Sequence, residues 1–218
     1  MRLATAFFGV VLTFMLATAA HGRAPVFATP DQAHLIRAAR SLQDGFERDA
    51  FDKFLLAARY GNKEAQKNVG LMYIKGLGVE KDWAKAHAWL RLAASHGDPR
   101  FASARDEIWG TLREDEKLAA ESHYREIRKE YGDLAALELR EEWVRKQKRE
   151  VTGSRLGKVG AMRVQVADAT GYQWEFSGTE FFSVLDTYVT DLKQHVGEVE
   201  IGEFEVIEGD SVSQDDGQ

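Results

Sequence analysis

Histidines and carboxylates are the side chains in this sequence that could hold a metal ion or move protons. The six histidines are spread along the chain, and none has a second histidine three or four residues away. Because metal-binding histidines on a helix occupy that spacing, the sequence predicts no metal site and no cofactor. His87 lies between Ala86 and Ala88, where we expect a packed or solvated imidazole.

The acidic residues form two short clusters. Glu114, Asp115 and Glu116 could bind a cation, as could Glu141 and Glu142. A helix start that favours negative charge and a solvated helix face account for them better. The sequence shows no paired acid and base and no activated nucleophile. We therefore predict a protein without catalytic activity, and an enzyme acting on cell-wall material is the least favoured alternative.

A glycine-rich segment, residues 153–160, contains Arg155 and Lys158 and could surround a phosphate group. It follows an expected helix and precedes an expected strand, which is the wrong context for a phosphate-binding loop. Ser154 lacks the flanking residues of a nucleophile elbow. We interpret the segment as a linker. The chain has no cysteine, which excludes disulfides, thiolate metal sites and a cysteine nucleophile.

The elements that would position a site follow an N-terminal targeting segment, residues 1–22. Arg2 provides a positive start, residues 3–16 are apolar, and small residues then suit signal peptidase. The apolar run is shorter than the roughly 20 residues of a membrane span. A cleaved signal peptide is expected, with an uncleaved anchor as the alternative. A secreted chain without cysteine suits a bacterial periplasm.

Two helical patterns joined by a glycine-containing turn form the most informative stretch of the chain. A helix is expected over residues 63–75. Gly76 and Gly78 would form the turn, because glycine adopts positive φ without strain. Asp82 is expected to cap the second helix. That helix carries an apolar stripe followed by a glycine stop: Ala86, Trp89, Leu90, Ala93, Ala94 and Gly97.

Part of this unit recurs upstream. A pair of alanines precedes Gly61 and another pair precedes Gly97, 36 residues later. Such a period of helix pairs is typical of an α-solenoid. Across residues 65–97 the chain resembles the Sel-one-like repeat family, a relative of the tetratricopeptide repeats. The family pattern is matched by Ala65, Gly70, Tyr73, Gly76, Gly78, Val79, Asp82, Lys85, Ala86, Trp89, Ala93, Ala94 and Gly97.

The resemblance implies a short solenoid of helix pairs over residues 31–150. It has one clean repeat at 65–100, a degenerate copy before it and capping helices after it, since a repeat array needs caps over its terminal apolar faces. Among the other helices, one is expected from Phe46 to Tyr60 with Phe46 on its apolar face. Another is expected to be capped by Asp133.

From residue 151 the apolar period changes from helical to alternating, which predicts a small α+β unit over residues 151–208. An acidic, disordered tail is expected at 209–218. The fold class is therefore mainly α, with a C-terminal ββαβ unit. The expected elements of that unit are strands at 162–166 and 172–176, a helix that starts at Ser177 or Thr179 and ends at Gly197, and a third strand at 199–206.

Charge divides the chain near the same boundary. Residues 159–218 carry two basic and thirteen acidic residues, whereas residues 1–158 carry a net charge of +5. This balance argues against nucleic acid as a partner of the acidic unit. Residues 140–158 are rich in Lys and Arg, and we expect Arg145 and Lys146 to help them dock on the acidic unit. Anionic lipid, lipopolysaccharide and nucleic acid are alternative partners for this segment.

The leading functional hypothesis is a protein-interaction module of the bacterial envelope. Solenoids bind protein or peptide partners on the exposed faces of their repeats. The candidate partner surface consists of Lys67, Asn68, Leu71 and Lys75. A groove lined by Met72, Tyr73, Trp83 and Trp89 is less favoured, because aromatic residues at helical spacing usually pack in a core.

An alternative places the function in the C-terminal unit. The chain would then be an envelope ligand-binding or stress-related protein, and the helices would serve as a platform. The acidic face of the unit, together with Tyr172, Trp174 and Phe181, would form the site.

Overall fold

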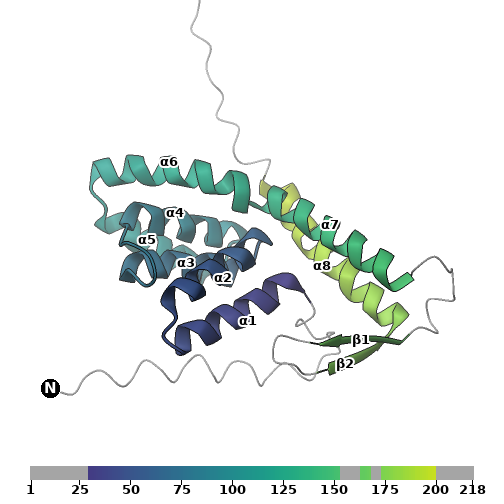
Figure 1. Ribbon diagram of the computed structural model, residues 1–218. Coiled ribbons are helices and arrows are strands. Elements are labelled where there is room, and N and C mark those ends of the chain that lie inside the picture. The colour runs from purple at the N-terminus through teal and green to yellow at the C-terminus, as the bar shows by residue number, and fades with distance from the viewer. Residues whose placement is uncertain (1–28, 153–162, 168–172, 200–218) are drawn as a thin grey trace, which may run out of the picture.

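The computed structural model describes residues 29–152, 163–167 and 173–199, which are mainly helical (Figure 1). The expected mainly α architecture, with helix pairs followed by a small α+β unit, is confirmed for these residues. The elements are α1 (Pro30–Gln43), α2 (Glu47–Arg59), α3 (Lys63–Lys75), α4 (Trp83–Ala93), the 3-10 turn η3 (Ala94–His96), α5 (Pro99–Thr111), α6 (Glu114–Tyr131), α7 (Asp133–Thr152), β1 (Arg163–Ala167), β2 (Gln173–Ser177) and α8 (Gly178–Val199).

The α3–α4 pair forms where the sequence predicts it. The Asn62 side chain caps α3 by accepting a hydrogen bond from the Ala65 backbone N–H, and Gly76 ends the helix in the left-handed conformation. Asp82 caps α4 through the Lys85 backbone N–H. Gly70 lies at the crossing of the two helices, where an added Cβ would be 3.1 Å from the Ala86 carbonyl oxygen.

The α3–α4 turn rests on the start of α2. Gly78 has φ of +67°, and a Cβ at this position would lie 2.5 Å from the backbone carbonyl carbon and oxygen of Glu47. Only glycine gives the turn both the required conformation and the required space. The α3–α4 pair is thereby held against α2 of the preceding helix pair.

Three main apolar clusters hold the described helices together. The first joins α1–α4 and includes Phe51, Trp89 and Tyr124 of α6. The second lies among α4, α5 and α6 around Leu90. The third joins α7, the hairpin and α8; its buried members are Val144, Val164, Phe176, Phe181, Leu185 and Val189.

The C-terminal hairpin and helix also form as expected, although the helix is longer. The strands β1 and β2 pair antiparallel with Val164 opposite Phe176. The helix α8 continues past Gly197 to Val199, so the expected helix end was wrong and Val199 does not begin a strand. The rest of the expected third strand, the signal segment, the 153–160 linker and the acidic tail lie outside the described residues.

Figure 1 shows α7 and α8 side by side, with the end of α8 close to the start of α7. The helix α7 contributes Val144 to the C-terminal apolar cluster. The domain boundary near residue 151 stays a prediction. Within the described residues, no helix is long and apolar enough to cross a membrane.

Two expectations about helix starts were also wrong. Phe46 precedes α2 and is 65% exposed, because its backbone lies outside the helix and its side chain is therefore not on the apolar face. Asp133 is the first residue of α7 rather than its cap. Its carboxylate contacts Lys63 and His96 instead of the helix backbone.

Candidate functional site

The expected partner surface lies along one side of α3. Lys67, Asn68 and Leu71 are half-buried, and Lys75 is exposed. Lys67 forms an ion pair with Glu64. Three of the four expected contact residues are therefore partly covered by other residues of the chain.

The α3 surface continues onto α5. The Lys67 ammonium group lies 5.5 Å above the ring of Phe101, and Arg100 is 3.7 Å from Glu64. Helices from two successive pairs thus contribute to one surface of mixed charge. This continuity across repeats could not be deduced from the α3 sequence alone.

The repeat-signature residues mainly pack the helices together or shape the turns between them. Ala65, Gly70, Ala86, Trp89, Ala93 and Ala94 are buried. Gly76, Gly78 and Gly97 have positive φ. The Tyr73 ring meets the ring of Phe51 edge-on, and Lys85 pairs with the capping Asp82.

The alternative aromatic groove is not formed. Met72 and Trp89 are buried in the core and Tyr73 packs against it. Trp83, at the start of α4, is 41% exposed. These residues therefore do not line a common groove.

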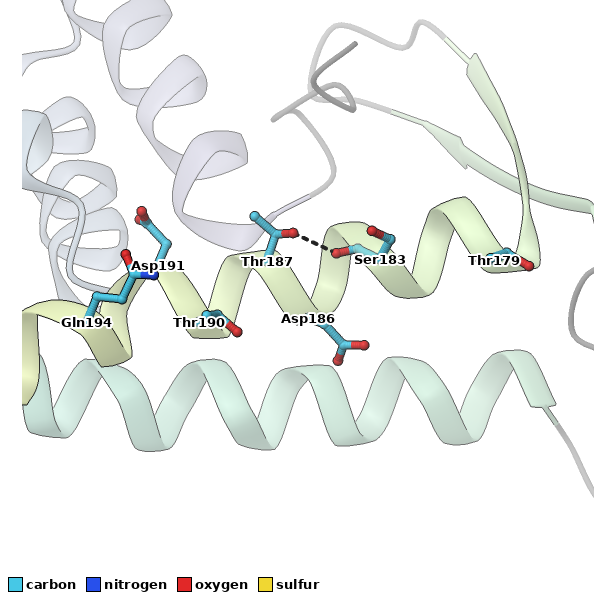
Figure 2. Close-up of a pocket in the computed structure, with 7 residues that line it drawn as sticks. All are labelled: Thr179, Ser183, Asp186, Thr187, Thr190, Asp191 and Gln194. Carbon is cyan, nitrogen blue, oxygen red and sulfur yellow. Dashed lines mark hydrogen bonds between the residues drawn. The ribbon is translucent and has the colours of Figure 1, made fainter.

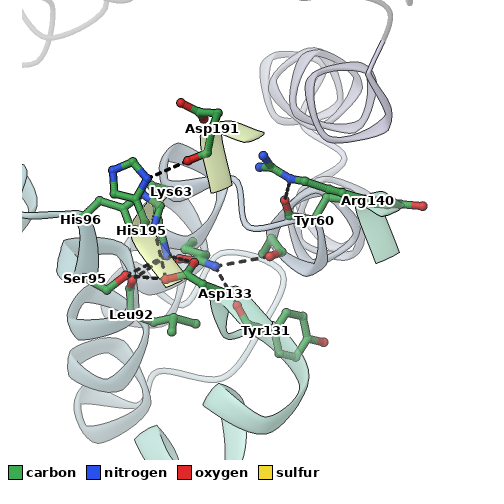
Figure 3. Close-up of polar contacts among 12 residues, drawn as sticks. Tyr60, Lys63, Leu92, Ser95, His96, Tyr131, Asp133, Arg140, Asp191 and His195 are labelled. Carbon is green, nitrogen blue, oxygen red and sulfur yellow. Dashed lines mark hydrogen bonds and ion pairs between the residues drawn. The ribbon is translucent and has the colours of Figure 1, made fainter. Parts of the chain in front are cut away.

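A group of ionisable side chains lies where α3, η3, α7 and α8 meet (Figure 3). We call Lys63, His96, Asp133 and His195 the ionisable junction. The Lys63 ammonium group is 2.8 Å from the Asp133 carboxylate, and their side chains are only 11% and 9% exposed. Lys63 also donates to the Leu92 carbonyl and the Ser95 hydroxyl.

Two histidines distant in sequence stack in this junction. The rings of His96 and His195 are 3.9 Å apart and within 12° of parallel. The Nε2 atom of His96 lies 3.1 Å from Asp133. The Nδ1 atom of His195 lies 2.9 Å from the carbonyl oxygen of Asp191, one turn earlier on α8.

The surroundings determine the charge of each group in the junction. Burial lowers the pKa of His96, although Asp133 opposes this effect. Burial also lowers the pKa of the Lys63 ammonium group. Burial alone would raise the pKa of the Asp133 carboxyl group, but His96 and Lys63 outweigh it and hold that pKa well below its usual range. Asp133 is therefore ionised and paired, and is poorly suited to accept a proton from a substrate.

A second polar contact lies beside the junction. Buried Arg140 donates from Nε to the Tyr60 carbonyl and from Nη1 to the Tyr188 carbonyl. Its guanidinium group also lies 4.3 Å from the Tyr188 ring centre. On the same side, Asn62 donates to the buried carboxylate of Asp31 at 2.9 Å. The helix α8 is thus attached to the helical stack through polar as well as apolar groups.

The basic segment does contact the acidic unit, but through residues other than those expected. Lys148 pairs with Asp186 of α8 at 2.6 Å, and Arg140 reaches the α8 backbone. Arg145 and Lys146 instead pair with glutamates on their own helix. Their expected role was wrong, because their positions on α7 direct them toward neighbours one turn away.

A shallow groove of about 530 Å³ runs along α8 (Figure 2). Its lining carries hydroxyl, amide and carboxylate groups: Thr179, Ser183, Asp186, Thr187, Thr190, Asp191 and Gln194. Phe181, expected at a C-terminal site, is instead buried in the core. The side chains of Tyr172 and Trp174 lie outside the described residues.

His87 is a packed side chain, in agreement with the first of the two expected environments. It is buried, and its ring lies 4.6 Å from that of Trp109. Burial, with a smaller effect from Arg91, lowers its pKa to about 4. Among the described residues no group of three or more histidine and acidic side chains is arranged to hold a metal ion.

Sequence reasoning missed the His96–His195 contact because it considered histidines on one helix. The partners are 99 residues apart and meet only because α7 and α8 bring the end of α8 back to the stack. A local spacing pattern could not have revealed this contact.

No protein-family model matches the chain, and no curated protein matches it. Among solved structures, the chain is similar to the crystal structure of c5321, a protective antigen present in uropathogenic Escherichia coli strains displaying an SLR fold. The sequence identity is 26% and the TM-score is 0.44. The similarity covers 61% of this chain and 27% of that chain, so this chain matches about a quarter of that protein's length.

Proposed function

We propose that this chain is a non-catalytic interaction module of the bacterial envelope, which binds a protein or peptide. The binding surface, here called the α3–α5 surface, consists of Lys67, Asn68, Leu71 and Lys75 of α3 together with Arg100 of α5. The observation that supports this proposal is the continuity of that surface across two successive helix pairs, through the Lys67–Phe101 and Arg100–Glu64 contacts. Repeat proteins bind extended partners on such multi-repeat faces. The partly exposed Leu71 and the charged Lys75 would provide apolar and ionic contacts.

Peptide selection tests the binding surface. A displayed library of random peptides is selected on the full chain, and the affinities of the selected peptides are measured by fluorescence anisotropy. The double variant Leu71→Asp with Lys75→Glu should weaken binding by at least about tenfold, since each lost contact contributes on the order of 1 kcal/mol. Circular dichroism and the melting temperature verify that the variant folds.

A matched control separates this surface from general effects of charge. Leu118→Asp with Lys129→Glu makes the same chemical changes on α6, where Leu118 is 75% exposed. This control should bind like the wild type. Equal loss in both double variants, or failure of the chain to select any peptide, would contradict the proposal.

The envelope location rests on the sequence of residues 1–22 and has its own test. Fusing residues 1–30 to an alkaline phosphatase that is active only after export should give activity in a bacterial host. Val11→Arg, which interrupts the apolar run, should abolish that activity. An inactive wild-type fusion would show that the location is wrong.

The groove on α8 supports a second candidate, a ligand-binding function of the C-terminal unit. Its hydroxyl and amide groups suit a polar ligand, and the Asp191 carboxylate favours a cationic one, whereas Asp186 is already paired with Lys148. Amide shifts of the full chain can be followed by NMR with a cationic tripeptide and a neutral disaccharide as probes. Shifts confined to Ser183, Thr187 and Thr190 would support this function, and the absence of shifts with both probes would argue against it.

A further inference from the structure

The stacked histidines bring together two segments that lie far apart in the sequence. His96 ends the η3 turn near the end of the clean repeat, and His195 lies near the end of α8. Two imidazole rings can stack face to face when at least one is neutral. Two imidazolium rings 3.9 Å apart would repel strongly in a partly buried site.

The groups around the pair do not compensate a second positive charge. From α3, Lys63 faces His96 and is itself cationic. From α7, the carboxylate of Asp133 contacts His96. Asp133 is already paired with Lys63. From α7, Arg140 adds positive charge that acts on Lys63. On α8, the group in contact with His195 is the uncharged carbonyl of Asp191.

We propose that the His96–His195 pair is a pH-sensitive latch, which holds the end of α8 on the helical stack at neutral pH and releases it in mild acid. The inference goes beyond the proposed binding function and does not depend on it. Release would uncover the chain around Gly61, where the Leu192 side chain would lie only 3.5 Å from an added Cβ. Mild acid would thereby expose the part of the helical stack around Gly61 that α8 covers at neutral pH.

The direction of the pH dependence follows from the burial of His96. Its pKa in the folded chain is lowered from the ordinary value. Its contribution to docking is therefore fully present above the unfolded pKa of about 6.5 and is lost as the pH falls below it toward the folded pKa. His87 has a pKa of about 4 and stays neutral throughout this window.

Hydrogen exchange on the full chain tests the latch. Amide protection is measured at about pH 7.5 and about pH 5.5 and corrected for the intrinsic dependence of exchange on pH. Residues 188–196 of α8 should lose at least about tenfold in protection at the lower pH, because protonation of the buried pair favours the released state. Protection in α3 and α4 should stay within about twofold.

Two ring substitutions make the test specific. His195→Phe retains a flat ring that cannot be protonated, so the repulsion between two imidazolium rings is removed and α8 protection should fall clearly less in acid than in the wild type. His123→Phe, on α6 and away from the junction, should respond like the wild type. If His195→Phe does not fold, His195→Gln replaces it with the same expectation.

Three results would overturn the latch. The wild-type α8 could keep the same corrected protection at both pH values. The His195 variants could lose protection in acid as strongly as the wild type, which would assign the effect to another group. Finally, α3 and α4 could lose as much protection as α8, which would indicate global unfolding.

Discussion

The α3–α4 pair and the ionisable junction are held by different kinds of contact. In the pair, backbones approach closely at Gly70 and Gly78, and apolar side chains fill the space between the helices. In the junction, a buried ion pair joins α3 to α7, and two stacked imidazoles join η3 to α8. The first region depends on shape and the second on ionisation, so different substitutions and conditions should weaken each.

The largest effect is expected from removing one partner of the buried ion pair. Asp133→Asn leaves the Lys63 ammonium group without its counter-charge, which should cost about 4 kcal/mol of unfolding free energy. Urea denaturation at neutral pH measures this loss. The control Glu126→Gln removes a carboxylate from the exposed pair with Lys129 and should cost less than about 0.5 kcal/mol. Similar losses in both variants would contradict the distinction between buried and exposed pairs.

The next effect comes from the close approach of backbones in the other region. Gly78→Ala places a methyl group against the Glu47 backbone and should cost about 3 kcal/mol. Gly97→Ala has the same left-handed conformation but no atom within 4 Å, so it should cost only about 1 kcal/mol. Both values come from urea denaturation. Equal costs would mean that the conformation alone, and not the contact with α2, requires glycine at residue 78.

A smaller effect is expected at the start of α4. Asp82→Ala removes the side-chain cap on the Lys85 N–H and should cost about 1 kcal/mol of unfolding free energy. Asp106→Ala removes an exposed carboxylate from the middle of α5 and should change stability by less than about 0.5 kcal/mol. Thermal unfolding of the two variants checks the difference. A larger cost for Asp106→Ala would show that the cap is not the relevant contact.

The two regions also differ in how well sequence alone predicted them. The helix at residues 63–75, the turn at Gly76 and Gly78 and the cap at Asp82 were predicted because each depends on residues a few positions apart. Local rules of helix start, stop and periodicity are sufficient there.

The junction escaped prediction because its geometry depends on how distant helices pack. Asp133 lies where a helix cap is expected, and no local pattern indicates that its carboxylate would pair with Lys63, 70 residues earlier. The same applies to His96 and His195. The contact between α7 and α8 was expected from charge, but its residues were not, since the rotation of α7 decides which basic side chains face α8.

The proposed latch requires His96 to be buried against α8 in its neutral form, and the titration of His96 tests this requirement. NMR of the full chain follows the imidazole signals against pH, with the urea-unfolded chain as the reference. We expect His96 to titrate below its value in the unfolded chain, because burial at the junction disfavours its charged form. A midpoint equal to or above the unfolded value would contradict the latch.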